Sequence, residues 1–403
     1  MLDINNYVSD GYTLEIFTAS VFQACNYYVD CNLKVIEERV CKKGSVDILE
    51  IDILARKYTK ENIELSIVEC KRGCTFEDLF KFVGISQYIK PEKSILVCQS
   101  NQLEEIKEAG LKTQTDVFEP NEIFYQYCAK EKILDMFYQS NLLINSFYQK
   151  NTIVRILKRK IRLSKKEKDA FGEVKKYLIE LIGRIWKIPN SIEKANAIYH
   201  LITSNKDFVR RIASTLYIRE KHKKSESYMM DNPICLAAAF IVLKARIAYI
   251  ISTVEVALQF YNGQIKELDD LEDENQEEMI MLLAKNIETA VLIPNFLQTL
   301  VYIFGGVLSL VDEDDKENIS SYMGTSFNNI INCLDLIERL FQIGKYKIQW
   351  GFTTDMKVLS FRYTPNPLKG YGILNRKKLG FSTENFSFSD EWIESLNDYR
   401  RKR

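Results

Sequence analysis

The chain has 403 residues, of which 46% are hydrophobic and 27% are charged, and this composition suits a packed globular protein and excludes a disordered or fibrous one. Lysine plus arginine and aspartate plus glutamate number 55 each, so no overall positive charge indicates a polyanionic partner, and a nucleic-acid surface would need a local cluster of basic residues. The length accommodates two or three domains.

Residues 1–125 alternate between helical and strand periodicity, which predicts a domain of the α+β or α/β class with a mixed sheet flanked by helices. The predicted elements are, in chain order, a helix at 13–26, strands at 33–40, 46–56 and 63–70, a helix at 75–89, a strand at 94–98, a short helix at 102–109 and a strand at 115–118. The residues with the clearest chemistry lie in this domain.

Residues 126–340 mostly have helical periodicity and predict a second, α-helical domain of unknown role. Its segments 233–261 and 290–311 are each long and apolar enough to raise the question of a membrane span. The residues in them that lipid would not satisfy are Lys244, Arg246 and Glu255 in the first segment and Pro294, Asn295 and Gln298 in the second. Because a helical bundle can pair such groups internally, we expect buried core helices and no membrane association.

Residues 341–403 change character again and predict a small C-terminal hairpin followed by a basic tail. Apolar residues alternate over 348–352 and again over 359–363, as in paired strands. The tail ends in YRRKR, and a second basic run occupies 158–168. Either phosphate contacts or a solvated helix face would explain that run.

Acidic residues stand at the ends of two neighbouring predicted strands. The alternate apolar positions 63, 65 and 67 form one strand face, which continues into Glu69 and Lys71. In the preceding strand Glu50 and Asp52 share the face that begins with the apolar positions 46 and 48. Two adjacent strands of this kind can direct several carboxylate oxygens at one point.

Such a group of carboxylates suits a metal ion that acts on a phosphodiester. Magnesium prefers oxygen ligands and is commonly held by one or two carboxylates together with a substrate phosphate. Asp52 and Glu69 would supply the carboxylates, and Lys71 would stabilise developing charge or position a water. Glu50 would be either a further metal ligand or the ion-pair partner of a basic residue. The alternative interpretation is a solvated salt bridge between Glu69 and Lys71, beside an aspartate that ends its strand.

The segments EIDILA at 50–55 and VECKRG at 68–73 resemble the PD-(D/E)xK nuclease superfamily, whose restriction-endonuclease-like fold has an acid on one central strand and an acid-x-lysine on the next. The resemblance covers residues 1 to about 120, is closest to the restriction-type and Mrr-like branches, and includes the order helix, three strands, helix, strand. It implies that Asp52, Glu69 and Lys71 are catalytic. The family often adds a glutamate on the first helix and sometimes a glutamine on the next, which would be Glu15 and Gln87.

Both additional residues also have a structural interpretation, and one position departs from the family pattern. Glu15 would lie in a first helical turn, where a carboxylate complements the helix dipole. Gln87 follows the apolar positions 76, 80 and 83 at helical spacing, which places it on the apolar face of its helix, where a polar group needs a partner. Ile51 stands where the family has a proline, a loosely kept position.

The resemblance implies a Mg²⁺- or Mn²⁺-dependent endonuclease that hydrolyses phosphodiester bonds in DNA, in restriction or bacterial anti-phage defence. The alternatives are a structure-specific repair or recombination nuclease, and a non-catalytic nucleic-acid-binding or scaffold protein that retains the nuclease fold. The residues themselves do not distinguish DNA from RNA. Because a nuclease that cuts both strands benefits from two sites related by a two-fold axis, we expect a homodimer.

Several other classes of site are not expected. The nine cysteines include no CxxC pair and suggest reduced thiols of a cytoplasmic protein, and no secretory signal is expected at the acidic N-terminus. His200 and His222 lie outside residues 1–125, which argues against a histidine-ligated zinc site there and against a Ser-His-Asp hydrolase. The chain has no GxxxxGK[ST] motif, so no nucleotide cofactor is expected.

Overall fold

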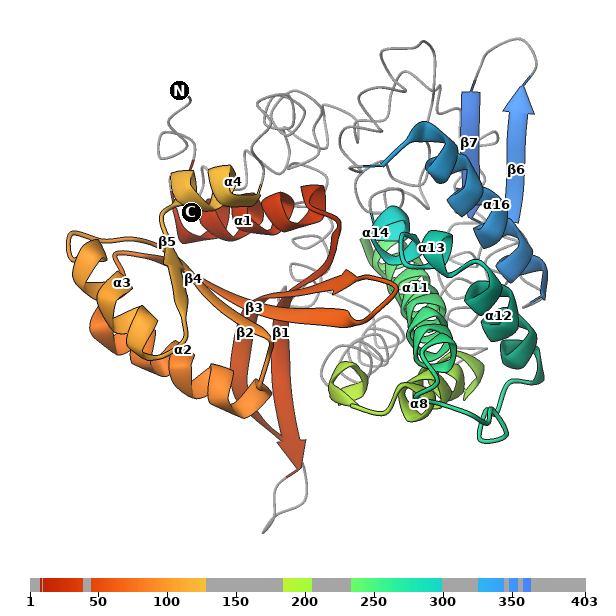
Figure 1. The fold of residues 1–403 in the computed structure, drawn as a ribbon, viewed down its shortest axis with the longest axis horizontal. Helices are drawn as coiled ribbons and strands as arrows, with labels where there is room; N and C mark the ends of the chain where they lie inside the picture. The colour runs from red at the N-terminus through yellow and green to blue at the C-terminus, as the bar shows by residue number, and fades with distance from the viewer. Residues whose placement is uncertain are drawn as a thin grey trace, which may run out of the picture.

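The computed structural model describes residues 8, 10–38, 45–127, 184–204, 233–298, 325–343, 348–353 and 358–363. Within them, an N-terminal α/β unit lies beside a group of helices, and the two meet along the first strands of the sheet (Figure 1). The basic run at 158–168 and the tail after 363 lie outside the described residues.

The N-terminal unit contains all eight elements that the sequence predicts, in the predicted order, and one further helix. The elements are α1 (Gly11–Ala24), β1 (Tyr27–Glu38), β2 (Ser45–Tyr58), β3 (Ile63–Arg72), α2 (Phe76–Ile89), β4 (Lys93–Gln99), α3 (Leu103–Lys112), β5 (Asp116–Phe118) and α4 (Pro120–Tyr127). The helix that was not predicted, α4, contains the expected domain boundary at 125 and packs on α1.

The five strands form one mixed sheet in the order β1-β2-β3-β4-β5. The pairs β1–β2 and β2–β3 are antiparallel, whereas β3–β4 and β4–β5 are parallel. The helices α2 and α3 make the two parallel crossovers and cover one face, while α1 and α4 cover the other (Figure 1). Strand β3 is therefore central, and its carboxyl end lies where the antiparallel and parallel halves of the sheet meet.

Local sequence explains how the chain turns at that end of β3. Gly73 has a φ of +76°, a conformation that a side chain makes costly, and it redirects the chain from β3 into α2. Thr75 then caps α2, because its hydroxyl accepts a hydrogen bond from the Asp78 N–H and the Asp78 carboxylate accepts one from the Thr75 N–H. The start of α2 is thus fixed close to the end of β3.

One hydrophobic core cluster of this unit lies between the sheet and α2 and α3. Its buried side chains include Ile67 on β3, Leu79 and Phe82 on α2, Leu96 on β4 and Ile106 on α3. The buried positions of α2 face the sheet. Burying one apolar side chain of this size stabilises the folded state by roughly 1.5–3 kcal/mol. The sheet is therefore a rigid platform for the side chains at its ends.

The remaining described residues are mostly helical, as predicted, and include the predicted hairpin. The elements are η3 (Ile185–Lys187), α8 (Ser191–Ser204), α11 (Pro233–Tyr261), α12 (Glu274–Lys285), α13 (Ile287–Ala290), α14 (Ile293–Gln298), α16 (Phe327–Ile343), β6 (Ile348–Thr353) and β7 (Val358–Tyr363). Strands β6 and β7 pair antiparallel. The first apolar segment is a single helix with the predicted bounds, whereas the described part of the second, residues 290–298, contains the last residue of α13 and the short helix α14.

In the part of the chain that the structure describes, no single helix is both long and apolar enough to cross a membrane. One pair, Glu274–Lys285 with Ile287–Gln298, meets the length and composition requirements together, but it bends by 102° at its break. Two polar side chains of the second apolar segment have partners in the N-terminal unit: Asn295 Nδ2 donates to Asn26 Oδ1 at 2.8 Å, and Gln298 Oε1 accepts from the Val29 N–H at 2.6 Å.

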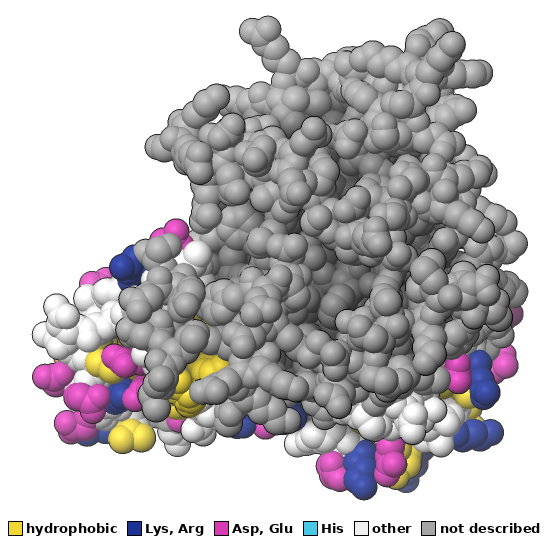
Figure 2. Space-filling model, turned by 90° about the horizontal axis from the view of Figure 1, so that it is seen from above, with side chains coloured by type: hydrophobic (Ala, Val, Ile, Leu, Met, Phe, Trp, Pro, Cys, Tyr) yellow, Lys and Arg dark blue, Asp and Glu magenta, His cyan; other side chains and the backbone are white. Residues whose placement is uncertain are grey.

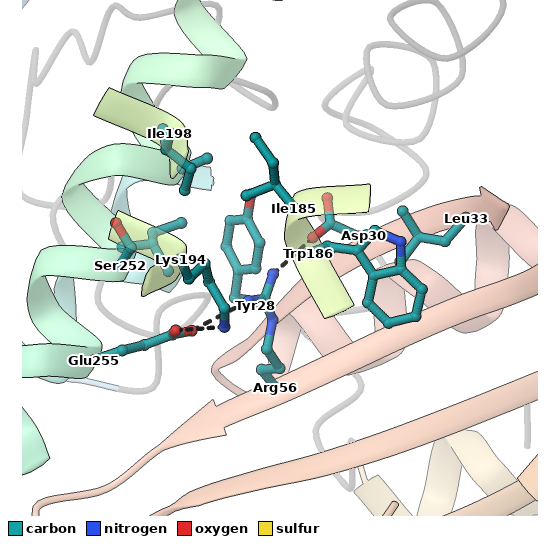
Figure 3. Close-up of a pocket in the computed structure, with 12 residues that line it drawn as sticks. Tyr28, Asp30, Leu33, Arg56, Ile185, Trp186, Lys194, Ile198, Ser252 and Glu255 are labelled. Carbon is teal, nitrogen blue, oxygen red and sulfur yellow. Dashed lines mark hydrogen bonds and ion pairs between the residues drawn. The ribbon is translucent and has the colours of Figure 1, made fainter. Parts of the chain in front are cut away.

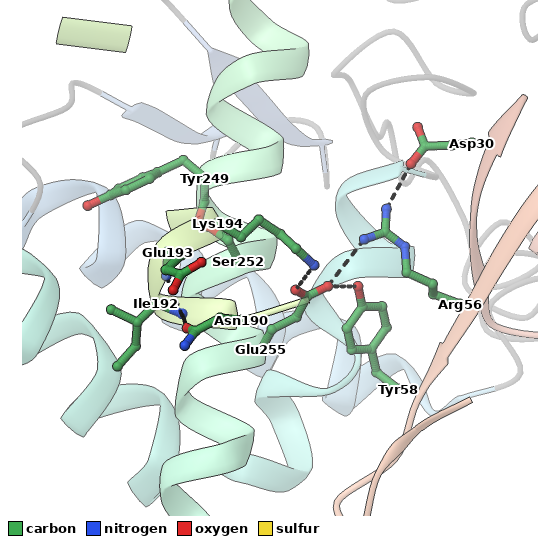
Figure 4. Close-up of polar contacts among 10 residues, drawn as sticks. All are labelled: Asp30, Arg56, Tyr58, Asn190, Ile192, Glu193, Lys194, Tyr249, Ser252 and Glu255. Carbon is green, nitrogen blue, oxygen red and sulfur yellow. Dashed lines mark hydrogen bonds and ion pairs between the residues drawn. The ribbon is translucent and has the colours of Figure 1, made fainter. Parts of the chain in front are cut away.

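A buried network of charges joins the helices to the sheet (Figure 4). The Arg56 guanidinium on β2 lies 2.8 Å from the Asp30 carboxylate and 3.2 Å from the Glu255 carboxylate on α11. Lys194 on α8 approaches the other oxygen of Glu255 at 2.7 Å, and the Tyr58 hydroxyl donates to Glu255 at 2.8 Å. The side chain of Glu255 is only 3% exposed, so its charge is compensated by these donors rather than by water.

A small cavity lies beside this network, between β1, β2 and the helices (Figure 3). Its volume is about 40 Å³, which suits a few water molecules and is far below the space that a cofactor needs. Arg56 and Trp186 line it, and their Nε and Nε1 atoms are buried without a hydrogen-bond partner among the described residues. Ordered water in this cavity would satisfy both donors.

Candidate active site

The structure brings Asp52, Glu69 and Lys71 together at the carboxyl end of β3. The antiparallel pairing of β2 with β3 runs to Ile53 opposite Val68, and the same register places Asp52 opposite Glu69. The Cys70 N–H donates to Asp52 Oδ2 at 3.0 Å, and Lys71 Nζ lies 2.6 Å from Glu69 Oε1. The predicted pair of carboxylates and their lysine neighbour therefore form one cluster.

Burial and mutual repulsion shift the protonation of both carboxyl groups. Desolvation by burial, followed by the charge of Glu69, raises the pKa of Asp52 to about 7, against the lowering effect of the Cys70 hydrogen bond. Burial likewise raises the pKa of Glu69, although Lys71 opposes this shift. The site therefore concentrates more negative charge than one lysine balances, which favours a cation between the carboxylates.

Glu15 on α1 is the third acid of this cluster. Its negative charge contributes to the raised pKa values of both Asp52 and Glu69, and its Oε2 accepts a hydrogen bond from Asn32 Nδ2 at 3.1 Å. Because α1 begins at Gly11, Glu15 lies beyond the first helical turn. The interpretation that Glu15 complements the helix dipole is therefore wrong. Glu15 instead lies close enough to Asp52 and Glu69 to act on their pKa values.

Asn32 on β1 is a residue of this cluster that the sequence analysis missed. It lies between the register pairs Cys31–Ile53 and Leu33–Ile51, which places it across from Asp52. Its φ is +51°, a conformation that asparagine tolerates better than most residues. The available signal was an asparagine next to a predicted strand, a residue type that strands disfavour.

Asp78 is a second missed neighbour, in the first turn of α2. Its charge acts on both Glu69 and Lys71. Although burial opposes the shift, its hydrogen bonds with Thr75 lower the pKa of Asp78, so its carboxylate is ionised and oriented as a helix cap. Asp78 therefore adds negative charge near the lysine while its oxygens are engaged in the cap.

The structure does not bring Glu50 or Gln87 to this cluster. Glu50 is exposed, and its Cα pairs with that of Lys34 on β1. Gln87 is exposed near the end of α2, nine residues after Asp78 and so about 14 Å further along the helix axis. The prediction that Gln87 lies on the buried face is wrong, because the apolar positions 76 and 80 used to define that face are themselves exposed.

The two carboxylates of this cluster suit a divalent metal ion, but the described protein groups do not form a complete set of ligands. Among the described residues, no group of three or more His, Cys, Asp or Glu side chains is placed to hold a metal ion. Magnesium does not require such a group, since it retains several waters and often takes only one or two carboxylates and a phosphate oxygen. The paired carboxylates of Asp52, which is half-buried, and Glu69, which is buried, meet that requirement.

An open depression adjoins the cluster at the carboxyl ends of β3 and β4. Its lining residues are Arg72, Gly73, Cys74, Gln99, Ser100, Asn101, Gln102 and Glu119. These side chains are mostly polar, and Arg72 follows Lys71 directly. At the margins of the face in Figure 2, where side chains are described, acidic and basic residues are intermingled.

Comparisons with protein-family models, with curated proteins and with solved structures find no match to this chain.

Proposed function

We propose that this protein is a metal-dependent nuclease that hydrolyses phosphodiester bonds in DNA, with its active site at Asp52, Glu69 and Lys71. The observation that carries the proposal is the pairing of a buried carboxylate, Glu69, with a half-buried one, Asp52, across adjacent strands, with Lys71 2.6 Å from Glu69. A surface salt bridge would not need a second buried carboxylate opposite it. The element order helix, three strands, helix, strand and the acid-x-lysine on β3 support membership of the PD-(D/E)xK superfamily.

Each side chain has a chemical role in this proposal. Bound Mg²⁺ or Mn²⁺ would polarise the phosphoryl group and lower the pKa of a water. Asp52 and Glu69 would hold that ion, and the Cys70 N–H fixes the orientation of the Asp52 carboxylate. The Lys71 ammonium, 38% exposed in its side chain, can reach a phosphate oxygen and stabilise negative charge there.

The proposal favours an endonuclease of restriction or anti-phage defence over a structure-specific repair nuclease only through the sequence resemblance. A panel of duplex, nicked, branched and single-stranded DNA, with RNA alongside, separates these activities. A non-catalytic scaffold is the less favoured alternative, because the complete group of acids and lysine would have no use in it. A homodimer and a cytoplasmic location belong to the same proposal.

The central test is cleavage of plasmid and linear DNA by the full chain, with Mg²⁺ or Mn²⁺ and with excess chelator. Asp52→Ala, Glu69→Gln and Lys71→Met should each lower the rate by at least about a hundredfold while the protein stays folded. Glu64→Gln is the matched control, because Glu64 is also a β3 carboxylate paired with a lysine, at 3.0 Å from Lys93, and it should cleave normally. Full activity in chelator, or in two of the three site variants, would contradict the proposal.

A further inference from the structure

We infer that the Asn32 side chain is a positioning residue of this site, which holds the Glu15 carboxylate beside the pair Asp52 and Glu69. The inference rests on the proposed function and adds a residue that the nuclease motif does not include. Two independent observations support it, the backbone conformation of Asn32 and the hydrogen bond of its side chain.

The backbone at Asn32 departs from a regular strand at the point where β1 passes Asp52. The residues on either side, Cys31 and Leu33, continue the antiparallel register with β2, but Asn32 has a φ of +51°. Non-glycine residues in this left-handed region cost free energy and tend to persist where the surrounding structure uses them. At this position the positive φ coincides with a side-chain hydrogen bond from Asn32 to Glu15 on α1.

In this conformation the Asn32 side chain forms a hydrogen bond with Glu15. Asn32 Nδ2 donates to Glu15 Oε2 at 3.1 Å, so an amide from the sheet restrains a carboxylate on the helix that covers it. Glu15 has to be restrained because the charges of Asp52 and Glu69 repel it, as their raised pKa values show. An amide donor counteracts that repulsion and adds no charge. Without it, Glu15 would turn away from the two carboxylates.

The chain offers a matched control for this inference. Asn26 also has a positive φ, of +66°, is also half-buried, and its Oδ1 accepts a hydrogen bond from the Asn295 side chain on α14. Asn26 and Asn32 therefore share residue type, backbone conformation and a side-chain hydrogen bond, but only Asn32 contacts the acid cluster.

Asn32→Gly is the informative variant, because glycine adopts a positive φ without cost and removes only the side chain. In the full chain, the Mg²⁺ concentration that gives half-maximal cleavage of supercoiled plasmid should rise by about tenfold or more, with the plasmid concentration for half-maximal rate little changed. Asn32→Asp, which retains the size of the side chain but replaces the amide donor with a carboxylate that repels Glu15, should have the same effect. Asn26→Gly should leave both concentrations unchanged.

Each outcome of this experiment is decisive. If wild-type protein cleaves with Mg²⁺ and Asn32→Gly responds to Mg²⁺ as wild type does, Asn32 serves only its backbone conformation and the inference is wrong. If Asn26→Gly shows the same loss as Asn32→Gly, the effect is one of general stability and the inference is equally wrong. If wild-type protein cleaves no nucleic acid with any metal, the proposed function fails first, and that result is distinguishable from the other two.

Discussion

Replacing Asp52 with asparagine should stabilise the metal-free protein while it removes activity. The pKa of Asp52 rises from 3.8 to about 7, first through burial and then through Glu69. A pKa raised in the folded state means that stability is complete below pH 3.8 and is lost as the pH rises through about 7. At about 1.36 kcal/mol per unit the full shift is roughly 4 kcal/mol, and because Glu69 shares the repulsion we expect Asp52→Asn to gain about 1–3 kcal/mol at alkaline pH.

The assay is urea denaturation in chelator at pH values below, within and above that window. The wild type should lose stability relative to Asp52→Asn as the pH rises, and the two should converge in acid. Added Mg²⁺ should stabilise the wild type and have little effect on Asp52→Asn, because a ligand stabilises only the state that binds it. Glu64→Gln is the control, and its expected change in stability at alkaline pH has the opposite sign, a loss. Although burial opposes the shift, the Tyr27 hydroxyl and then Lys93 lower the pKa of Glu64. An Asp52→Asn protein less stable than wild type at alkaline pH would refute the reasoning.

Three further results are expected. Glu255→Gln should destabilise the protein by about 3–5 kcal/mol in urea denaturation, since it leaves the buried Arg56 and Lys194 charges without their shared partner; a change within experimental error would contradict this. Gln87→Ala and Glu50→Ala should each retain near-wild-type plasmid cleavage, and a loss comparable to that of Lys71→Met would place them in the site. Calcium should bind but fail to support cleavage, because its longer and looser coordination positions water and phosphate poorly; equal rates in Ca²⁺ and Mg²⁺ would count against the metal role.

The fold of the N-terminal unit could be predicted because its local signals agree with one another. Strand and helix periodicity predicted the eight elements in order, although β1 begins at Tyr27, six residues before its predicted start. The alternation of β3 also predicted the face that ends in Glu69 and Lys71. The same face alternation predicted that Asp52 would meet Glu69. These are short-range patterns, which a single sequence displays directly.

What could not be predicted depends on pairs of residues that are distant in the chain. Arg56 and Glu255 are 199 residues apart, and no local pattern indicates that they meet. Asn32 was missed because its role follows from a local φ and from a partner on another element. The burial of Gln87 was misjudged because the apolar positions of α2 occur on more than one side of the helix, and only tertiary packing selects the side that faces the sheet.

The β1 strand has a consequence for how the N-terminal unit can be handled on its own. It is the edge strand of the sheet, and Gln298 on α14 accepts the hydrogen bond of its Val29 N–H. Cutting the chain after residue 127 would remove that acceptor and the Glu255 carboxylate, which would leave an open sheet edge and an Arg56 guanidinium with Asp30 as its remaining carboxylate partner. Exposed sheet edges pair readily with strands of other molecules, so the isolated unit would tend to aggregate by edge-to-edge pairing. In the full chain the helices cover this edge and prevent such pairing along that side.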